Sequence, residues 1–475
     1  MKTNLLPANT NLQARSLPVS SLGLERGCSS RSTLNCQPTR RSHSRGSLVS
    51  PPAAAGTAAT RSLQSALCFV ALLISSLTLH AADWPQYRGL NHDGATAEKI
   101  LKSWPAEGPK VIWKAPLGPS FGSFAVSGGK AFCFIQRSVD GEDKEVAIAL
   151  DAATGKELWA VPLGKATYDK QGGDGPRSTP TVDGNRVYFF GAYQVLTCLD
   201  AATGKQIWQH DLVKEFSGVV ITWNSAASPV LDGDLVIVNG GGEGRAFLAF
   251  NKTDGKLVWQ SEDDAPTHAT PTPATIHGVH QLIFLTKKSL VAITPKDGKV
   301  LWRYAFPFRT STAASPIVWK DMVYCSAAYN VGAAVVQITK TNNEFAATEL
   351  WRKRNELMNH WTTPVCKDGY IYGIYGQGQN ATAPLKCIEM ATGNEKWSQP
   401  GFGGGGATIL VDGNVLAQAD RGPLVLVEGK PEEYHELARA EIYSGKCWTM
   451  PVVSNGRIFA RNTKEGFCLD ATPAK

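Results

Sequence analysis

Seven residues of types that commonly contact ligands stand just before short strand-like segments of this 475-residue sequence. They are two arginines, two histidines and three tryptophans: Arg177, Trp223, His268, Arg309, His360, Trp361 and Trp448. Aromatic rings and cations in a concave site suit anionic or planar ligands, or a peptide. The alternative is that the tryptophans fill a channel and the cations pair with neighbouring acids. We expect a ligand-binding site here, without a catalytic residue.

The two histidines do not indicate a metal site, because neither His268 nor His360 has a cysteine or carboxylate at ligand spacing. The chain also contains no Cys-x-x-Cys, His-Glu-x-x-His or phosphate-loop sequence. The usual motifs of zinc, metalloprotease and nucleotide sites are therefore missing. We expect neither a bound metal nor a catalytic centre.

The elements that position these residues belong to an internal repeat of about 45 residues. One unit reads Leu-Asp-Ala-Ala-Thr-Gly-Lys-x-x-Trp at residues 150–159 and again at 199–208. We expect the Asp to accept turn N–H groups, the Gly to adopt a positive φ, and the Trp to point inward from the next strand. The residues assigned to this structural role are Asp151, Gly155, Trp159, Asp200, Gly204, Trp208, Gly255, Trp259, Gly298, Trp302, Trp351, Gly393 and Trp397.

A second unit precedes these turns, as in Ser-Thr-Pro-Thr-Val-Asp-Gly at residues 178–184, and reads as strand, tight turn, strand. The two units give four strands per repeat. No helical period follows residue 100, apart from one short turn that residues 431–440 could form. Four-stranded units at this period are typical of propeller blades. We predict an all-β, eight-bladed β-propeller of four-stranded antiparallel blades, with inner strands beginning near residues 123, 178, 227, 270, 314, 362, 407 and 450.

The two ends of the repeat array complete one another. The last repeat lacks its Trp strand, and the first Trp strand, residues 110–116, has no blade in front of it. We expect this N-terminal strand to pair with the C-terminal blade and remove an open sheet edge.

Charge and composition divide the chain before the repeats. Residues 1–82 contain eight cations and one acid, which accounts for the whole net charge of +7, so residues 83–475 sum to zero. This balance argues against nucleic-acid binding. We interpret residues 1–60 as a disordered leader, 61–82 as a signal peptide, 83–108 as an N-terminal extension packing on the propeller, and 109–475 as the propeller itself. A start codon assigned too far upstream would explain the long leader.

The repeat resembles the PQQ-binding-like family, which includes quinoprotein alcohol dehydrogenases and the BamB lipoprotein. More narrowly, residues 83–89 (Asp-Trp-Pro-Gln-Tyr-Arg-Gly), 175–180 and 445–449 are similar to secreted bacterial members such as those of planctomycetes. The family's dehydrogenases hold PQQ between a tryptophan and a disulfide of adjacent cysteines, beside a calcium ion. This chain has no adjacent cysteine pair, and no Asp and Asn set can be carried over. We therefore predict no cofactor, and PQQ with calcium only under the alternative below.

The resemblance and the missing cofactor residues lead to one main hypothesis. We expect an exported, non-catalytic, BamB-like scaffold, residing in the periplasm or cell envelope, that binds an envelope protein or a small or polymeric ligand. We expect a monomer with no stable membrane span and no nucleic-acid partner. Two alternatives stay open, a PQQ-dependent dehydrogenase with a divergent site and a carbohydrate-binding propeller.

Overall fold

The computed structural model describes residues 83–166, 168, 173, 175–310, 312–377 and 380–473. All of them belong to one compact unit, Leu77–Lys475. The interpretations of residues 1–60 and 61–82 lie outside the described residues and stay predictions. Within the described part, no helix is long and apolar enough to cross a membrane.

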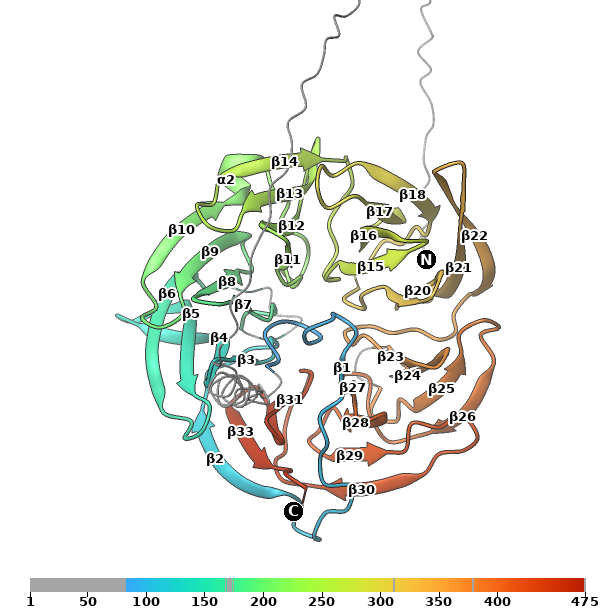
Figure 1. Ribbon diagram of the computed structural model, residues 1–475. Coiled ribbons are helices and arrows are strands. Elements are labelled where there is room, and N and C mark those ends of the chain that lie inside the picture. Colours follow the sequence, from blue (N-terminus) through green and yellow to red (C-terminus); the bar gives the residue numbers. More distant parts are fainter. Residues whose placement is uncertain are drawn as a thin grey trace, which may run out of the picture. The chain divides into compact units, whose positions relative to one another are not determined.

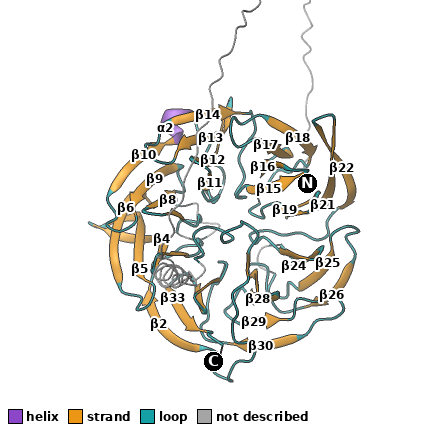
Figure 2. Ribbon diagram, in the orientation of Figure 1, coloured by secondary structure: helices purple, strands orange, loops and turns teal. Residues whose placement is uncertain are grey.

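Eight sheets make up this unit and stand around a common centre (Figure 1). Almost all regular structure is strand (Figure 2). Blade one contains β3 (Ala125–Ser127), β4 (Lys130–Val139), β5 (Glu142–Asp151) and β6 (Glu157–Lys165), and blade two contains β7 (Thr181–Asp183), β8 (Arg186–Phe190), β9 (Val195–Asp200) and β10 (Gln206–Asp211). Blade three contains β11 (Val230–Asp232), β12 (Leu235–Gly242), β13 (Arg245–Asn251) and β14 (Leu257–Ser261), and blade four contains β15 (Thr272–Ile276), β16 (Val279–Leu285), β17 (Ser289–Ile293) and β18 (Val300–Ala305).

The second half of the ring repeats this plan. Blade five contains β19 (Ile317–Trp319), β20 (Met322–Ala327), β21 (Gly332–Thr341) and β22 (Glu344–Lys353), and blade six contains β23 (Val365–Lys367), β24 (Tyr370–Ile374), β25 (Leu385–Glu389) and β26 (Glu395–Gln399). Blade seven contains β27 (Ala407–Val411), β28 (Asn414–Gln418), β29 (Leu424–Val427) and β30 (Glu436–Ala440), and blade eight contains β31 (Val452–Ser454), β32 (Arg457–Arg461), β33 (Glu465–Asp470) and β2 (Lys110–Pro116). The predicted eight-bladed propeller is confirmed.

The ring closes as predicted, because β2 pairs antiparallel with β33, from Lys110 opposite Asp470 to Pro116 opposite Glu465. Buried apolar residues fill each space between neighbouring sheets, and the cluster across the closure joins blades seven, eight and one. The short turn considered for residues 431–440 is wrong, since β30 occupies Glu436–Ala440. A helix does occur at α2 (Leu212–Phe216), where the Asp211 side chain caps the Lys214 N–H.

Most turns of the repeat receive the tryptophan of the preceding blade. Trp113 Nε1 donates to the Ala152 carbonyl at 3.0 Å, and a Cβ added to Gly155 would lie only 2.7 Å from the Trp113 ring. Glycine is needed here both for φ +72° and for this close approach. The same indole-to-carbonyl bond recurs at Trp159, Trp208, Trp259, Trp351 and Trp397, whereas Trp302 donates to Gln281. Asp151 and Asp200 accept turn N–H groups, as expected.

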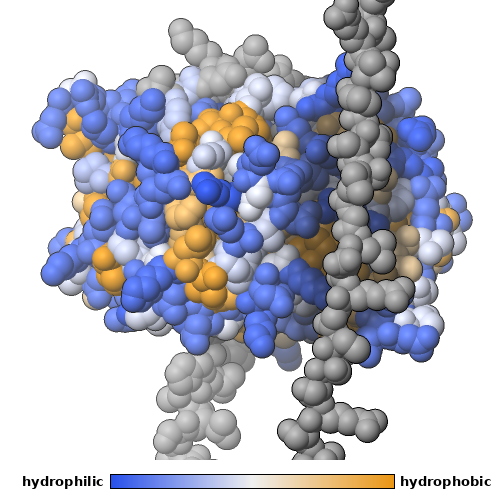
Figure 3. Space-filling view, turned by 90° about the horizontal axis from the view of Figure 1, so that it is seen from above, coloured by the Kyte–Doolittle hydropathy of each residue, from blue (hydrophilic) through white to orange (hydrophobic). Residues whose placement is uncertain are grey.

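The rim of the ring is mostly polar with small apolar patches, as Figure 3 shows for the side near β14. Apolar side chains that are at least two-fifths exposed occur in the outermost strands, one or two positions before a tryptophan: Val111, Leu158, Ile207, Leu257, Val258 and Leu350. The strand period turns the residue next to each tryptophan to the opposite face. A register shift just before the tryptophan also exposes the residue two positions earlier at Val111 and Leu257.

Residues 83–101 run across the middle of the ring, in blue in Figure 1. Trp84 forms a bridge with Val126 of the first blade, and β1 (Ala95–Thr96) adds to β27 in parallel. The buried Arg88 donates to the Thr363 carbonyl of the sixth blade at 3.3 Å. This segment therefore links blades that are distant in sequence across the middle of the ring.

Candidate functional site

A ring of hydroxyl groups joins the starts of the inner strands. Thr179, Ser228, Thr270 and Thr363 each precede a proline. The Thr179 N–H donates to Ser228 Oγ at 2.9 Å, and the Ser228 N–H donates to Thr270 Oγ1 at 2.9 Å. The same relation joins Ser123 to Thr179 and Ser315 to Thr363. These bonds tie neighbouring blades together around the axis and bring their hydroxyl groups into the channel.

A cavity of about 330 Å³ opens at this end of the channel. Six of the seven predicted binding residues line it: Arg177, Trp223, His268, His360, Trp361 and Trp448. They come from blades two, three, four, six and eight. The volume lies at the lower end of the range of small-molecule sites, roughly 300–1,000 Å³. The shape is therefore that of a pocket for a small ligand or for the end of a larger one.

Arg309 does not reach this cavity. The side chain of Phe308 is buried in the core between blades four and five, and the next residue, Arg309, is exposed to solvent. The fifth blade contributes Tyr329 instead, from the connection between β20 and β21. The cavity is also lined by three aromatic residues that the sequence prediction did not include: Tyr87, Phe121 and Tyr329.

The aromatic side chains form a continuous arc along the cavity wall. Trp448 stacks between Phe121, at 5.6 Å between ring centroids, and Trp361, at 4.0 Å. Trp361 stacks in turn on His360 at 4.1 Å. The arc continues from His360 to Tyr329 and from Tyr329 to Trp223. The Tyr329 and Trp223 rings are nearly parallel, with 6.1 Å between their centroids. A curved aromatic wall of this kind offers flat apolar surface to a ring-shaped ligand.

Two cations stand at one end of the arc. The guanidinium of Arg177 lies 5.4 Å from the centre of the Phe121 ring, and the Lys446 ammonium lies 4.2 Å from that of Trp448. Arg177 also donates to the carbonyls of Gly173 and Gly175, at 3.0 and 2.8 Å. These contacts hold positive charge beside the aromatic rings.

The two histidines of the cavity wall, His268 and His360, are neutral near pH 7. Burial lowers the pKa of His360 to about 3, with a further contribution from His268. Burial and the charge of Arg177 lower the pKa of His268 to about 4. A neutral imidazole offers one donor and one acceptor nitrogen. The cavity is thus cationic on the Phe121 side and uncharged at its histidines.

A buried carboxyl group lies behind Arg177. Glu145 accepts hydrogen bonds from Tyr168 Oη at 2.9 Å and from the Ala192 N–H at 3.2 Å. Burial nevertheless raises its pKa to about 7, partly offset by these donors and by Arg177. Glu145 does not line the cavity, but its carboxyl group interacts electrostatically with Arg177, which does.

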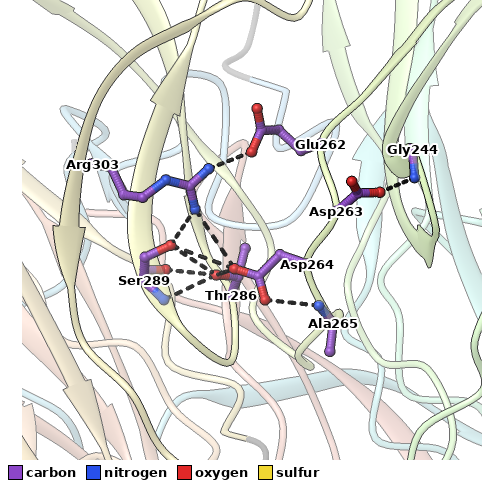
Figure 4. A network of polar contacts seen from close by, with 8 residues as sticks. All are labelled: Gly244, Glu262, Asp263, Asp264, Ala265, Thr286, Ser289 and Arg303. Carbon is purple, nitrogen blue, oxygen red and sulfur yellow. Dashed lines mark hydrogen bonds and ion pairs between the residues drawn. The ribbon is translucent and has the colours of Figure 1, made fainter. Parts of the chain in front are cut away.

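The loop that leads to His268 is held by a second polar network, shown in Figure 4. The buried Asp264 accepts from Thr286 Oγ1 at 2.6 Å and from the Ala265 N–H at 2.8 Å. Arg303 lies 3.7 Å from the same carboxylate. These bonds restrain the backbone four residues before His268.

One Gly-x-Ser-x-Gly sequence, residues 118–122, lies beside the cavity and matches the pattern of a nucleophile elbow. Its Ser120 is fully buried, donates to the Pro176 carbonyl at 3.0 Å and accepts the Gly122 N–H at 3.0 Å. The Ser120 hydroxyl group therefore stabilises a turn. Phe121, in the middle of this sequence, is the residue that reaches the cavity.

The family model described as outer membrane protein assembly factor BamB matches residues 142–399. The chain belongs to this family. Among solved structures, this BamB-family chain is similar to quinohemoprotein alcohol dehydrogenase from Comamonas testosteroni, at 13% identity and a TM-score of 0.59 over 83% of this chain and 81% of that chain. It is also similar to BamB from Moraxella catarrhalis, at 14% identity and a TM-score of 0.53 over 77% and 98%.

A search among curated proteins found no match. At these identities the solved structures establish the fold of the BamB-family chain and leave its activity open. The similarity to planctomycete members stays a prediction.

Proposed function

We propose that this BamB-family chain is an exported, non-catalytic binding protein of the cell envelope whose central cavity holds a ligand. The observation that carries the proposal is the aromatic arc, in which Trp223, Trp361 and Trp448 from three different blades line one cavity. Half-buried indole rings around a small cavity provide much apolar contact area at little entropic cost. The family description, an outer membrane assembly factor, supports an envelope location and a protein partner as part of this proposal.

A calcium-assisted quinone cofactor does not fit the residues that line the cavity. Calcium prefers six to eight oxygen ligands, carboxylates among them, and the described lining contains no Asp or Glu. Within the described part of the chain, no three His, Cys, Asp or Glu side chains gather closely enough to hold a metal ion. The seven cysteines of that part are free, so none supplies the disulfide of the dehydrogenases. We therefore favour binding over PQQ-dependent oxidation.

The proposal is tested with the full chain and a Trp361→Ala, Trp448→Ala double variant. Each protein is equilibrated with a small-molecule extract of the source organism's envelope, washed and denatured, and the released compounds are compared by mass spectrometry. We expect a compound that the wild type releases and the double variant does not. Equal release from both proteins, or none from either, contradicts ligand binding in the cavity. Dye-linked oxidation of alcohols after addition of PQQ and calcium contradicts a non-catalytic role.

A further inference from the structure

We propose that the cavity binds the terminal unit of an acidic oligosaccharide, with its acidic group on the Phe121 side and its ring oxygens at the hydroxyl groups of Thr179, Ser228 and Thr270. This inference rests on the proposed function and names the ligand class of the same cavity. Three features of the cavity and its immediate surroundings carry it.

The first feature is a set of unused hydroxyl donors. Thr179, Ser228 and Thr270 are buried, line the cavity and come from three successive blades. In the part of the chain that the structure describes, each hydroxyl oxygen accepts one backbone N–H and makes no other hydrogen bond. A hydroxyl group also carries one donor hydrogen, and buried polar groups are normally satisfied. The three O–H groups therefore favour a ligand rich in acceptor oxygens.

The second feature is the combination of aromatic faces with neutral imidazoles. A saccharide ring has apolar C–H faces, which pack against indole rings, and hydroxyl groups that both donate and accept. His268 and His360 line the cavity and are uncharged at neutral pH, so they add polar ring atoms to the lining without adding charge. A flat polyanion would meet no compensating charge at these histidines, so the lining matches a saccharide better.

The third feature is where the cations lie. Arg177 and Lys446 both stand over the Phe121 ring, with the charged group 5.4 and 5.6 Å from its centre. Arg177 lines the cavity, Lys446 lies next to it, and the rest of the described lining contains no Asp, Glu, Lys or Arg. Positive charge at one end of such a cavity orients a ligand that carries its acidic group at one end. A uronate at the end of a chain has this form.

A peptide fits the lining less well. Extended peptides are usually held by backbone N–H and C=O groups of an open strand edge. Here the N–H groups of Ser123, Thr179 and Ser228 are already taken by the hydroxyl ring. The inner strands thus offer side-chain hydroxyls in place of a backbone edge.

The experiment is calorimetric titration of the full chain with the trisaccharides of galacturonate, glucuronate and mannuronate, each beside its carboxyl-reduced neutral counterpart. We expect at least one acidic trisaccharide to bind at least about tenfold more tightly than its neutral counterpart. Lys446→Met should reduce this preference. Tighter binding of naphthalene-2,6-dicarboxylate, a flat aromatic diacid, than of every saccharide would overturn the proposal.

The hydroxyl donors are tested by a matched pair in the inner strand of the fourth blade. Thr270→Val removes a hydroxyl that lines the cavity, whereas Thr272→Val removes one that donates to the Pro316 carbonyl at 2.8 Å, outside the cavity. Both variants lose one bond between blades, so thermal unfolding should change similarly. We expect Thr270→Val to weaken saccharide binding about tenfold, Thr270→Ser to restore it, and Thr272→Val to leave it within about twofold.

Equal affinities for the two valine variants would contradict the assignment of the hydroxyl donors. If no saccharide binds while the wild type still releases a tryptophan-dependent compound from the envelope extract, the saccharide inference is wrong and the binding function stands. If neither experiment detects a ligand, both proposals are wrong.

Discussion

The indole rings of Trp361 and Trp448 stack at 4.0 Å between centroids and 23° between planes, although they belong to the sixth and eighth blades. The seventh blade lies between them in the chain and contributes the run Gly403–Gly406, just before β27. A Cβ added to Gly405 would lie only 2.1 Å from Trp448 Cδ1. The seventh blade therefore makes room for this stack by having no side chain at that point.

We predict that Gly405→Ala separates the two indole rings. The added methyl group cannot coexist with Trp448 in its present place, and overpacking of this kind costs about 1–3 kcal/mol. The measurement is the exciton signal of stacked indoles in circular dichroism, which should weaken, together with ligand affinity, which should fall. Gly164→Ala is the control, because its added Cβ has no neighbour within 4 Å. An unchanged exciton signal in Gly405→Ala would show that Trp448 adapts without leaving the stack.

The buried histidines predict a loss of stability in acid. Burial lowers the pKa of His360 from 6.5 to about 3 and that of His268 to about 4. Between these values and 6.5 the unfolded chain binds more protons, so the free energy of unfolding is highest above pH 6.5 and falls as the pH drops toward 4. Each histidine contributes up to about 1.4 kcal/mol per pH unit in this range.

Urea unfolding at a series of pH values measures this slope. We expect His360→Gln to flatten it between pH 6.5 and 4, whatever its effect on stability at pH 7. Thr348→Gln, at an exposed position without a titratable side chain, is the control and should leave the slope as it is. A slope that His360→Gln does not alter would mean that the folded protein already binds this proton.

The repeat was sufficient to predict the blades, because turn residues and inward tryptophans recur at a nearly constant period. It could not show that Trp113 packs on Gly155 of the next blade, since a period does not say which copy a side chain touches. Pairing of residues 110–116 with the last blade was predictable because the last repeat lacks its tryptophan strand, while residues 110–116 form a tryptophan strand that has no blade in front of it.

The cavity was only partly predictable. Positions just before inner strands could be found from the repeat, and Arg177, Trp223 and Trp448 do line the cavity. That Arg309 lies outside the cavity could not be predicted from the sequence. Burial of Phe308 decides where the Arg309 side chain points, and that burial depends on the packing of blades four and five. Tyr329 lies in a connection that varies between repeats. The hydroxyl ring had a signal, a Ser or Thr before proline in most repeats, whose meaning needs the neighbouring blade.

The contact between Trp113 and Gly155 predicts a specific cost for side chains in the turn. Gly155→Ala combines φ +72° with a Cβ 2.7 Å from the Trp113 ring. Gly128→Ala meets a similar φ of +56° but no neighbour within 4 Å. We expect Gly128→Ala to lower the free energy of unfolding by about 1–2 kcal/mol and Gly155→Ala by roughly 1–3 kcal/mol more.

A double-mutant cycle with Trp113→Ala tests the origin of this difference. Without the indole, Gly155→Ala should cost no more than Gly128→Ala in urea unfolding. If the extra cost persists in the Trp113→Ala background, it comes from the turn itself and not from the contact between blades.

The network around Asp264 predicts that two neighbouring aspartates differ sharply in importance. Asp264 is buried and accepts from Thr286 and Ala265, whereas Asp263 is exposed and accepts from the Gly244 N–H (Figure 4). Asp264→Ala leaves buried donors unsatisfied and should lower the free energy of unfolding by roughly 2–4 kcal/mol. Asp263→Ala should stay within about 0.5 kcal/mol of the wild type. Because the same loop leads to His268, Asp264→Asn should weaken ligand binding more than Asp263→Asn does, and equal affinities would show that His268 is held by other contacts.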